Sequence, residues 1–337
     1  MNARLATATI AVAATATALI TACGSTSSKS PNASTPAATV TYPLTLTAAN
    51  GPVTIKARPQ RIVSLSATAT EDLYAVGAGS QVVAVDADSD YPSTSPSTST
   101  SPSTSTSPST TTSPVPKTSL NSQSPNLEAI AKYRPDLVIA AQNTGGLVAG
   151  LGKLSIPVLI EPAATRLTDA YTQISQIGQA TGHQAQANQT VQTMRTQIQN
   201  DIKQAGTEHK NLTYYWELTA RPYYSVTSQT FIGQIVGLFG LTNIADSAAK
   251  ASDGGYPQLS DEYIVAARPQ IIFLADNQGA DGGQSPSVVA KRPGWQAIPA
   301  VKDTEIVGLN DDIASRWGPR LPQLIAQIAQ AVESTNR

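Results

Sequence analysis

Asn126-Leu-Glu-Ala-Ile-Ala-Lys-Tyr-Arg-Pro-Asp-Leu-Val-Ile-Ala-Ala141 returns later in the chain, without gaps, as Ser260-Asp-Glu-Tyr-Ile-Val-Ala-Ala-Arg-Pro-Gln-Ile-Ile-Phe-Leu-Ala275. In both copies a polar cap precedes an acidic first turn and a short helix, Arg-Pro ends the helix, and an apolar strand follows. Glu128 therefore falls on Glu262. Two such units predict two α/β lobes of related build, and two-lobed proteins commonly act in the cleft between their lobes.

The composition of the whole chain limits the classes of function. The chain has 337 residues, enough for two domains with cores of their own. Its net charge is -1 and only 13% of its residues are charged. Nucleic-acid binding needs a basic footprint that this balance does not supply. The sole cysteine, Cys23, excludes an intramolecular disulfide.

The N-terminus has the pattern of a secretory signal followed by a tether. Arg4 precedes a mildly apolar stretch that ends in Ile20-Thr-Ala-Cys23, and small residues before a cleavage point mark such a signal. The stretch is short and threonine-rich for a spanning helix. We therefore expect residues 1–22 to be a signal peptide. Residues 23–39, rich in Ser, Thr, Pro and Ala, are expected to be a disordered tether.

Ile20-Thr-Ala-Cys23 also resembles the lipobox of bacterial lipoproteins, in which the cysteine is lipidated and becomes the mature N-terminus. This resemblance implies lipidation of Cys23 and an extracytoplasmic protein held on the cell membrane through its lipid anchor alone. The alternative is a short membrane anchor with an incidental cysteine. No twin arginine is present, so general secretion is expected.

Residues 40–167 have the strand–helix alternation of a parallel, doubly wound sheet, and are expected to form the N-terminal lobe. A hairpin with its turn at Asn50-Gly51 comes first, followed by a buried strand and a helix over Thr68–Val76. Glu71 and Asp72 lie early in that helix, where the helix dipole favours acids.

Residues 93–116 interrupt the alternation. Proline recurs every six residues from Pro96 to Pro114, with Ser and Thr between, and this composition cannot form a packed core. The segment is predicted to be an extended, solvated insertion in the loop before the first copy of the repeat. Serine and threonine beside proline suggest O-glycosylation.

Residues 168–206 are expected to link the lobes. Their apolar residues follow a helical period with a break at Gly182, and about 22 residues after the break would span roughly 33 Å. Residues 207–337 form the expected C-terminal lobe, with a strand near Tyr214–Leu218, the second copy of the repeat and a final helix from Pro319.

Five motifs, in this order, carry a resemblance to a known family. They are Pro59-Gln-Arg-Ile-Val-Ser-Leu-Ser-Ala-Thr-Ala-Thr-Glu71, Ser89-Asp-Tyr-Pro92, Asn126-Leu-Glu-Ala-Ile with Arg134-Pro-Asp-Leu-Val-Ile139, Tyr256-Pro-Gln-Leu-Ser-Asp-Glu262 and Arg316-Trp-Gly-Pro-Arg320. Together they resemble the periplasmic binding proteins of iron-siderophore and vitamin B12 ABC importers, from about Ala57 to the C-terminus.

The resemblance implies a fold and a function. The fold would be the class III, helical-backbone type, with two doubly wound α/β lobes joined by a single long rigid helix and little hinge motion. The function would be that of a lipid-anchored solute-binding protein, a monomer, which captures a metal chelate and delivers it to the permease dimer of an ABC transporter. It implies no resident cofactor, because the ligand itself would carry cobalt or iron.

In this family, one surface glutamate on each lobe contacts arginines of the permease. The matching positions here are Glu128 and Glu262, and two exposed carboxylates on separate lobes suit a symmetric pair of basic pockets. An acid in the first helical turn is also favourable for the helix alone, which is the other reading of both positions.

The candidate ligand-binding residues follow the predicted strand ends, where ligands of open α/β sheets bind. Aromatic rings offer flat apolar area with a polar edge, and an arginine can bind carbonyl, phosphate or carboxylate groups. The candidates are Tyr91, Tyr223, Tyr224, Tyr256, Asp312, Arg316 and Trp317. Arg320 is expected to be structural, and pairing of Arg316 with Asp312 is the structural alternative for Arg316.

The ligand stays open between a corrinoid, a ferric siderophore and haem. Corrinoid binders often place tryptophans on the first-lobe side of the cleft, whereas the segments Ser119–Pro125 and Ala141-Gln142 contain no aromatic residue. The chain has two histidines, His183 and His209, so a haem held by histidine would need an unusual position, although a tyrosine ligand is possible.

The sequence gives little support for an enzymatic function. Neither histidine lies in metal-ligand spacing or beside a candidate nucleophile, and the chain has no Gly-x-Ser-x-Gly, phosphate loop or dinucleotide fingerprint. We therefore expect no enzymatic activity and no protein-borne metal site. The alternatives to a solute-binding protein are an anchored α/β hydrolase and a structural cell-wall lipoprotein.

Overall fold

The computed structural model describes residues 40–93, 114–207, 209, 211–278 and 283–335. These residues belong to one compact unit. The predicted signal peptide, the predicted tether with Cys23, and all but the ends of the predicted insertion 93–116 lie outside the described residues.

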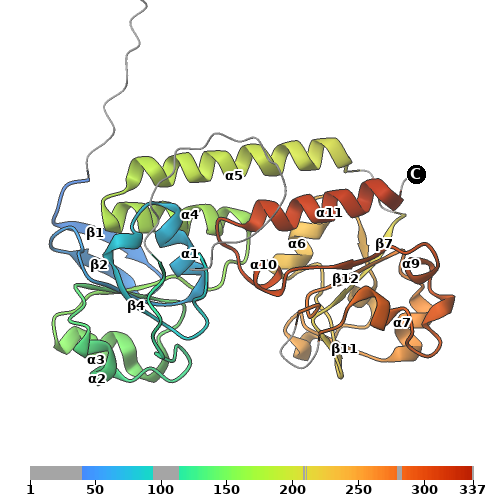
Figure 1. Cartoon of the computed structure of the whole chain (residues 1–337), viewed down its shortest axis with the longest axis horizontal. Coiled ribbons are helices and arrows are strands. Elements are labelled where there is room, and N and C mark those ends of the chain that lie inside the picture. Colours follow the sequence, from blue (N-terminus) through green and yellow to red (C-terminus); the bar gives the residue numbers. More distant parts are fainter. Residues whose placement is uncertain (1–39, 94–113, 208, 210, 279–282, 336–337) are drawn as a thin grey trace, which may run out of the picture. The chain divides into compact units, whose positions relative to one another are not determined.

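The first lobe contains a hairpin and a four-stranded sheet (Figure 1). Its elements are β1 (Leu44–Ala48), β2 (Gly51–Ile55), β3 (Ile62–Leu65), α1 (Ala67–Ala75), η1 (Gly79–Gln81), β4 (Val82–Val85), α2 (Leu127–Lys132), β5 (Leu137–Ala140), η2 (Thr144–Gly146), α3 (Leu147–Lys153) and β6 (Val158–Ile160). Asn50 in the hairpin turn donates to the carbonyl of Val158 at 2.9 Å, which fixes the hairpin to β6.

Two helices follow the first lobe, α4 (Leu167–Thr181) and α5 (Gln184–Ala205). The break between them is at Gly182, as predicted, with a left-handed backbone at φ 78°. In Figure 1, α5 runs over both lobes, and α4 and the C-terminal helix α11 pack against it.

The second lobe repeats the plan of the first, with an added small sheet. Its elements are β7 (Thr213–Glu217), β8 (Thr219–Ala220), β9 (Tyr223–Tyr224), α6 (Phe231–Gly237), β10 (Thr242–Asn243), η3 (Ile244–Ser247), η4 (Ala251–Asp253), β11 (Gln258–Leu259), α7 (Asp261–Ala267), β12 (Ile271–Leu274), α8 (Pro286–Val289), η5 (Trp295–Ala297), α9 (Pro299–Lys302), β13 (Ile306–Gly308), α10 (Asp311–Ser315) and α11 (Leu321–Thr335).

The two main sheets have the same topology. The order is β4-β3-β5-β6 in the first lobe and β10-β7-β12-β13 in the second, and every neighbouring pair is parallel. The strands of the sequence repeat, β5 and β12, occupy the same place in their sheets. The prediction of two α/β lobes of related build is therefore confirmed.

The repeated helices begin and end as the sequence predicted. Asn126 and Ser260 accept hydrogen bonds from the backbone amides of Ala129 and Tyr263, and so cap α2 and α7. Each helix then stops where an arginine adopts the left-handed backbone conformation, at φ 47° in Arg134 and 53° in Arg268. The following proline cannot continue a helix, and the chain turns into the core strand.

Both faces of each sheet are covered. One large apolar cluster contains residues of both lobes and of α4, α5 and α11, so the lobes share a continuous core along the connecting helices. Separate clusters lie on the other faces, under α2 and α3 in the first lobe and under α7 to α9 in the second. This is the doubly wound arrangement predicted from the strand–helix alternation.

One sequence-based interpretation is wrong. Glu71 and Asp72 were expected to stabilise α1 through the helix dipole, but α1 begins at Ala67 and carries no acid in its first turn. Both carboxylates are instead 2% exposed and point into the interior. Among the described helices, none is long and apolar enough to cross a membrane.

Candidate functional site

A cavity of about 570 Å³ lies where the two lobes meet. On the first lobe it is lined by residues that follow the carboxyl ends of three parallel strands, among them Ser66 after β3, Asp86 after β4 and Ala141 after β5. On the second lobe it is lined by Asp312 and Trp317, in and just after α10. Carboxyl ends of parallel strands are the usual ligand position in open α/β sheets.

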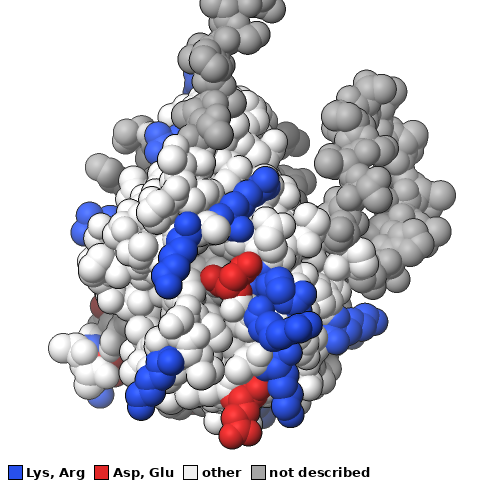
Figure 2. Space-filling model, turned by 90° about the vertical axis from the view of Figure 1, so that its left-hand side faces the viewer, with Lys and Arg blue, Asp and Glu red and all other residues white. Residues whose placement is uncertain are grey.

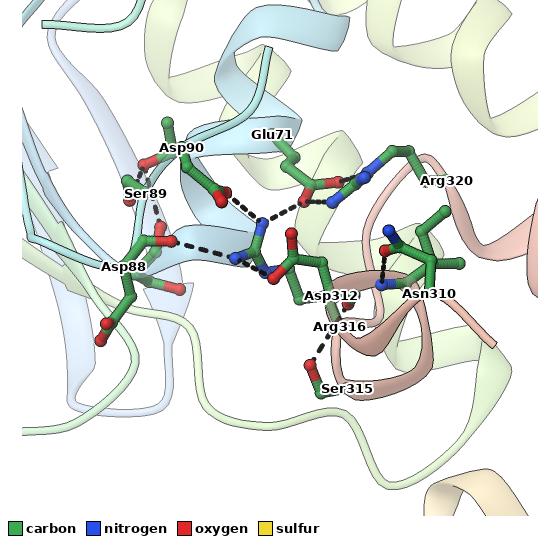
Figure 3. Close-up of polar contacts among 12 residues, drawn as sticks. Glu71, Asp88, Ser89, Asp90, Asn310, Asp312, Ser315, Arg316 and Arg320 are labelled. Atoms are coloured by element: carbon green, nitrogen blue, oxygen red, sulfur yellow. Dashed lines mark hydrogen bonds and ion pairs between the residues drawn. The ribbon is translucent and has the colours of Figure 1, made fainter. Parts of the chain in front are cut away.

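Arg316 crosses from the second lobe to the first at the edge of this cavity (Figure 3). One terminal nitrogen donates to Glu71 at 2.9 Å and Asp90 at 3.0 Å, and the other to Asp312 at 2.7 Å and to the carbonyl of Asp88 at 3.0 Å. The four terminal N–H groups of the guanidinium are thus all used. Arg316 contributes charge to the cavity wall, but little remaining capacity to bind a ligand.

Arg320 makes a second connection between the lobes. Its Nε donates to Glu71 at 2.8 Å and its terminal nitrogen donates to the other oxygen of the same carboxylate. Its guanidinium lies 4.1 Å from the centre of the Tyr91 ring, a cation–π contact. We call Glu71, Asp90, Asp312, Arg316 and Arg320 the interlobe ion cluster.

The centre of the interlobe ion cluster is largely removed from water, whereas the side chains of Asp90 and Asp312 at its edge are 62% and 39% exposed. The side chain of Glu71 is 1% exposed, and those of Arg316 and Arg320 are 11% and 12% exposed. Two cations and their hydrogen bonds replace the hydration that the Glu71 carboxylate loses at this depth. Trp317 adds a neutral contact between the second lobe and the connecting helices, since its indole N–H donates to Gln173 of α4 at 2.7 Å.

Two further carboxyl groups are buried close to Glu71. Burial and the neighbouring charges of Glu71 and Glu161 raise the pKa of Asp72 well above its usual range. Burial raises the pKa of Glu161, at the end of β6, to about 8. One oxygen of each, Asp72 Oδ1 and Glu161 Oε1, has no hydrogen-bond partner within the described part of the chain. Glu161 is therefore expected to be protonated near neutral pH.

The formal charge of the interlobe cavity wall is negative, although burial raises the pKa of Asp86 and of Asp312. Its wall includes the carboxylates of Asp86, Asp88, Asp90 and Asp312, against the single cation Arg316. Because Arg316 is fully engaged in hydrogen bonds, a bound ligand would meet these carboxylates together with neutral hydroxyl and amide groups, such as those of Ser122, Gln123 and Gln142. Such a wall suits ligands that carry N–H donors or positive charge.

A second cavity, of about 700 Å³, lies within the second lobe on the other side of α10. Its wall includes Arg221, Asp276, Arg292 and Asp311. Arg292 forms two hydrogen bonds of 2.6 Å with buried Glu217. Burial and the charge of Glu217 raise the pKa of Asp276 to about 7. Asp311 lines this cavity and Asp312 the interlobe cavity, so the first turn of α10 separates the two.

The structure brings only part of the predicted ligand site together. Asp312, Arg316 and Trp317 line the interlobe cavity, and Tyr91 lies beside it under Arg320. Tyr223, Tyr224 and Tyr256 line neither cavity described above. Tyr223 is 6% exposed and packs against Trp295, with ring centres 5.8 Å apart, whereas Tyr224 and Tyr256 are exposed.

Sequence reasoning missed Glu71, the centre of the interlobe ion cluster. A signal was present, because Ala67-Thr-Ala-Thr-Glu-Asp-Leu contains no lysine or arginine and mostly small or apolar residues, which is typical of a buried helix. An acid within such a helix needs a cation, and Arg316 and Arg320 stood in a motif already singled out. The expectation that Arg320 is structural agrees with its contacts.

Glu128 and Glu262 lie in the first turns of α2 and α7, one on each lobe, and both are exposed. Figure 1 shows α2 and α7 at the lower ends of their lobes, on the same side of the molecule. Within the described ranges, no group of three or more His, Cys, Asp or Glu side chains is arranged to hold a metal ion.

Known proteins are similar to this chain in sequence and in fold. A family model described as periplasmic binding protein matches residues 62–313. An uncharacterized ABC transporter substrate-binding lipoprotein of Bacillus subtilis, YvrC, is 28% identical over 302 residues, covering 87% of each chain. A vitamin B12-binding protein of Pectobacterium atrosepticum is 30% identical over 284 residues, covering 81% of this chain and 89% of the relative.

A solved structure has the same fold at lower sequence identity. The periplasmic haem-binding protein RhuT of Roseiflexus aligns with a TM-score of 0.65 at 22% identity, covering 82% of this chain and 99% of that chain. This likeness supports the two-lobed architecture and says nothing of the ligand.

Proposed function

Because this chain belongs to the periplasmic binding protein family, we propose that it is a lipid-anchored receptor that captures a metal chelate between its lobes and presents it to an ABC permease. The family predicted from the five motifs is confirmed. Its members bind and transport ligands, so the chain is a binding protein rather than an enzyme, and the hydrolase alternative falls away.

The interlobe cavity carries the proposal. It lies at the carboxyl ends of β3, β4 and β5, and residues of the second lobe complete its wall. About 570 Å³ falls in the range of cavities that bind small molecules, and a bulky chelate would extend from it between the lobes. The interlobe ion cluster holds both lobes against this cavity in a defined position.

The charge of the cavity favours a corrinoid among the candidate ligands. Its wall is rich in carboxylates, and the primary amides around a corrin ring offer N–H donors without negative charge. A triscatecholate siderophore or the propionates of haem would place anions against Asp86, Asp88 and Asp90. The relative that binds vitamin B12 supports the same choice. A cationic hydroxamate siderophore fits the same electrostatics and is the second candidate.

Fluorescence titration tests the ligand. We expect cobalamin to quench the emission of Trp317, which lines the cavity, while Trp216 and Trp295 are fully buried and respond less. Trp317→Phe should remove most of the quenching while a calorimetric titration still detects binding. Tighter binding of haem or of a ferric triscatecholate than of cobalamin would overturn the corrinoid assignment. Absence of binding by any of these chelates would remove the chelate proposal itself.

A charge variant separates electrostatics from shape. Asp88→Asn removes one carboxylate from the cavity wall and keeps the backbone carbonyl that Arg316 uses. We expect its affinity for a cationic hydroxamate chelate to fall about two- to fivefold and its affinity for an anionic chelate to rise, because wall charges act at close range. Asp303→Asn, an exposed acid after α9, is the matched control and should change neither.

We further propose that Glu128 and Glu262 dock on the permease. Both carboxylates are exposed, lie on corresponding helices of the two lobes, and form no ion pair with any residue that the structure describes. The double variant Glu128→Ala with Glu262→Ala should bind ligand normally and fail to support uptake in cells. Asp303→Ala with Glu333→Ala removes the same charge elsewhere and should leave uptake intact. Normal uptake by the first pair would refute docking through these residues.

Membrane attachment through Cys23 is supported by the motif Ile20-Thr-Ala-Cys23 and by the lipoprotein relative. Cys23 lies outside the described residues. Replacement by serine should move the protein from the membrane fraction to the soluble extracytoplasmic fraction, and unchanged membrane attachment would argue for another anchor.

A further inference from the structure

Charges are segregated within the first lobe. Residues 40–167 contain eight basic and eight acidic residues, so the formal net charge of the lobe is zero. Six of the acids lie in or near the cleft: Glu71, Asp72, Asp86, Asp88, Asp90 and Glu161. The opposite, outer end of the lobe is correspondingly basic. This separation gives the outer end a positive potential that the net charge of the chain conceals.

Figure 2 shows this outer end, with basic side chains gathered on one face. The outer basic patch consists of Lys56, Arg58, Arg61, Arg134 and Lys153, all exposed. It surrounds a cavity of about 620 Å³, whose wall includes Lys56, Arg58 and the neighbours of Arg134 and Lys153.

The acid within the patch neutralises little of it. The carboxylate of Asp136 accepts hydrogen bonds from the backbone amides of Gln60 and Arg61, at 2.8 and 2.9 Å. Arg61 donates to backbone carbonyls of Tyr133 and Arg134, and Arg58 donates to the carbonyl of Thr181. No cation of the patch forms a salt bridge with a described acid, so their charge faces solvent.

An exposed apolar side chain stands inside the patch. Leu154 follows Lys153 at the end of α3, lines the same cavity, and is 56% exposed. Cations that surround an exposed leucine are typical of surfaces that lie on an anionic bilayer, since the cations attract headgroups and the apolar side chain enters the interface.

We propose that the outer basic patch binds the anionic phospholipid surface of the membrane on which the protein is held. The patch includes Lys56, which directly follows β2, and β2 pairs with β1, the first strand of the described chain. The chain thus enters its fold at this lobe. A tether of residues 23–39, fully extended, reaches at most about 60 Å, so the patch stays within reach of the bilayer. That the patch lies near the bilayer rests on the proposed lipid anchoring of Cys23. The existence of the patch does not depend on that anchoring.

Vesicle binding tests the proposal without any ligand. The chain from Gly24 onward, which keeps the whole described unit and lacks the acylation site, is mixed with phosphatidylcholine vesicles that contain or lack about one third phosphatidylglycerol. We expect sedimentation with the anionic vesicles at low salt, release at high salt, and no binding to the neutral vesicles.

Matched variants locate the surface. Each cation near an anionic bilayer contributes about fivefold in binding, so Lys56→Gln, Arg134→Gln and Lys153→Gln together should weaken it by about a hundredfold. Lys203→Gln, Lys250→Gln and Lys302→Gln remove the same charge from exposed positions elsewhere and should weaken it less than about threefold. Leu154→Ala should weaken binding to anionic vesicles without changing its salt dependence.

Three results would overturn the proposal. The first two are an equal loss of vesicle binding in the two triple variants, and equal binding of the parent protein to neutral and anionic vesicles. The third is release of the bound protein by inorganic polyphosphate when the concentration of phosphate charges is below that of the anionic lipid. The last would assign the patch to a soluble polyanion. Failure here is distinct from failure of the proposed function, because chelate binding by the patch variant is measured on the same sample and should be normal.

Discussion

The carboxylate of Glu71 receives three hydrogen bonds from two arginines of the opposite lobe, at a depth where its side chain is 1% exposed. A buried ion pair gains its stability from geometry and hydrogen bonding, because both partners have lost their water. Removing one partner lowers the free energy of unfolding by more than the intact pair contributes to it, since the other charge is left buried without compensation.

Glu71→Ala is therefore expected to lower the free energy of unfolding by about 3 kcal/mol, since Arg316 keeps Asp90 and Asp312 but Arg320 keeps no carboxylate in the cluster. Urea denaturation followed by fluorescence measures the change. Glu128→Ala, which removes an exposed glutamate from α2, should stay within about 0.5 kcal/mol of the parent protein. Similar effects of the two substitutions would show that the interlobe ion cluster does not stabilise the fold.

Glu161 predicts how stability depends on pH. Burial raises its pKa from 4.5 to about 8, so the folded state holds a proton that the unfolded state releases. The free energy of unfolding should then fall as pH rises from 4.5 to about 8, by up to a few kcal/mol, with Asp72 acting in the same direction. Denaturation midpoints across this range should fall less steeply in Glu161→Gln than in the parent protein, whereas Asp303→Asn should leave the slope unchanged.

Residue roles were only partly predictable from the sequence. Asp312, Arg316 and Trp317 were recognised because they follow the last strand, and strand ends are where ligands bind. Their partner Glu71 was not recognised, because it belongs to α1 of the other lobe. No local sequence pattern can predict a contact between residues 245 positions apart. Tyr223 has the same local signal as a cleft residue, yet the added sheet β8-β9-β11 turns it against Trp295.

Helices and strands were predicted from the sequence more completely than the roles of single residues. The repeat marked α2 with β5 and α7 with β12, because caps, apolar periodicity and Arg-Pro stops are local signals that tertiary structure reinforced. The small sheet β8-β9-β11 was missed, since its strands have two residues each and no alternation can be recognised at that length.

Gly178 sets the separation of α4 and α5. A Cβ atom there would lie 2.2 Å from the Cβ of Ala187, so Gly178→Ala must push the two helices apart or distort them. We expect a loss of about 1–3 kcal/mol in the free energy of unfolding, measured by urea denaturation. Gly237→Ala is the control: this helical glycine of α6 has no atom within 4 Å of the added Cβ, and alanine there should stabilise by about 0.5 kcal/mol. A neutral Gly178→Ala would contradict the close approach of α4 and α5.

At the scale of the whole molecule, the described chain has two distinct electrostatic faces. The cleft is acidic and the outer end of the first lobe is basic, while Glu128 and Glu262 stand on corresponding helices of the two lobes. The two-lobed architecture followed from the repeat and the family motifs. The segregation of charge could not be foreseen, because the bases from Lys56 to Arg61 and the acids from Glu71 to Asp90 are close neighbours in the sequence. They reach opposite ends of the lobe only when β3, β4 and β5 point their carboxyl ends at the second lobe.

The contacts of Glu71 also fix the order in which the molecule can be completed. They join residues 245 and 249 positions apart, and a chain exported from its N-terminus delivers Glu71 early and both arginines near the end. Until the last turns of the chain have crossed the membrane, the first lobe holds a buried carboxylate without its cations. An interrupted chain that ends before Arg316 should accordingly be cut by proteases in its first lobe, where the full-length protein resists them.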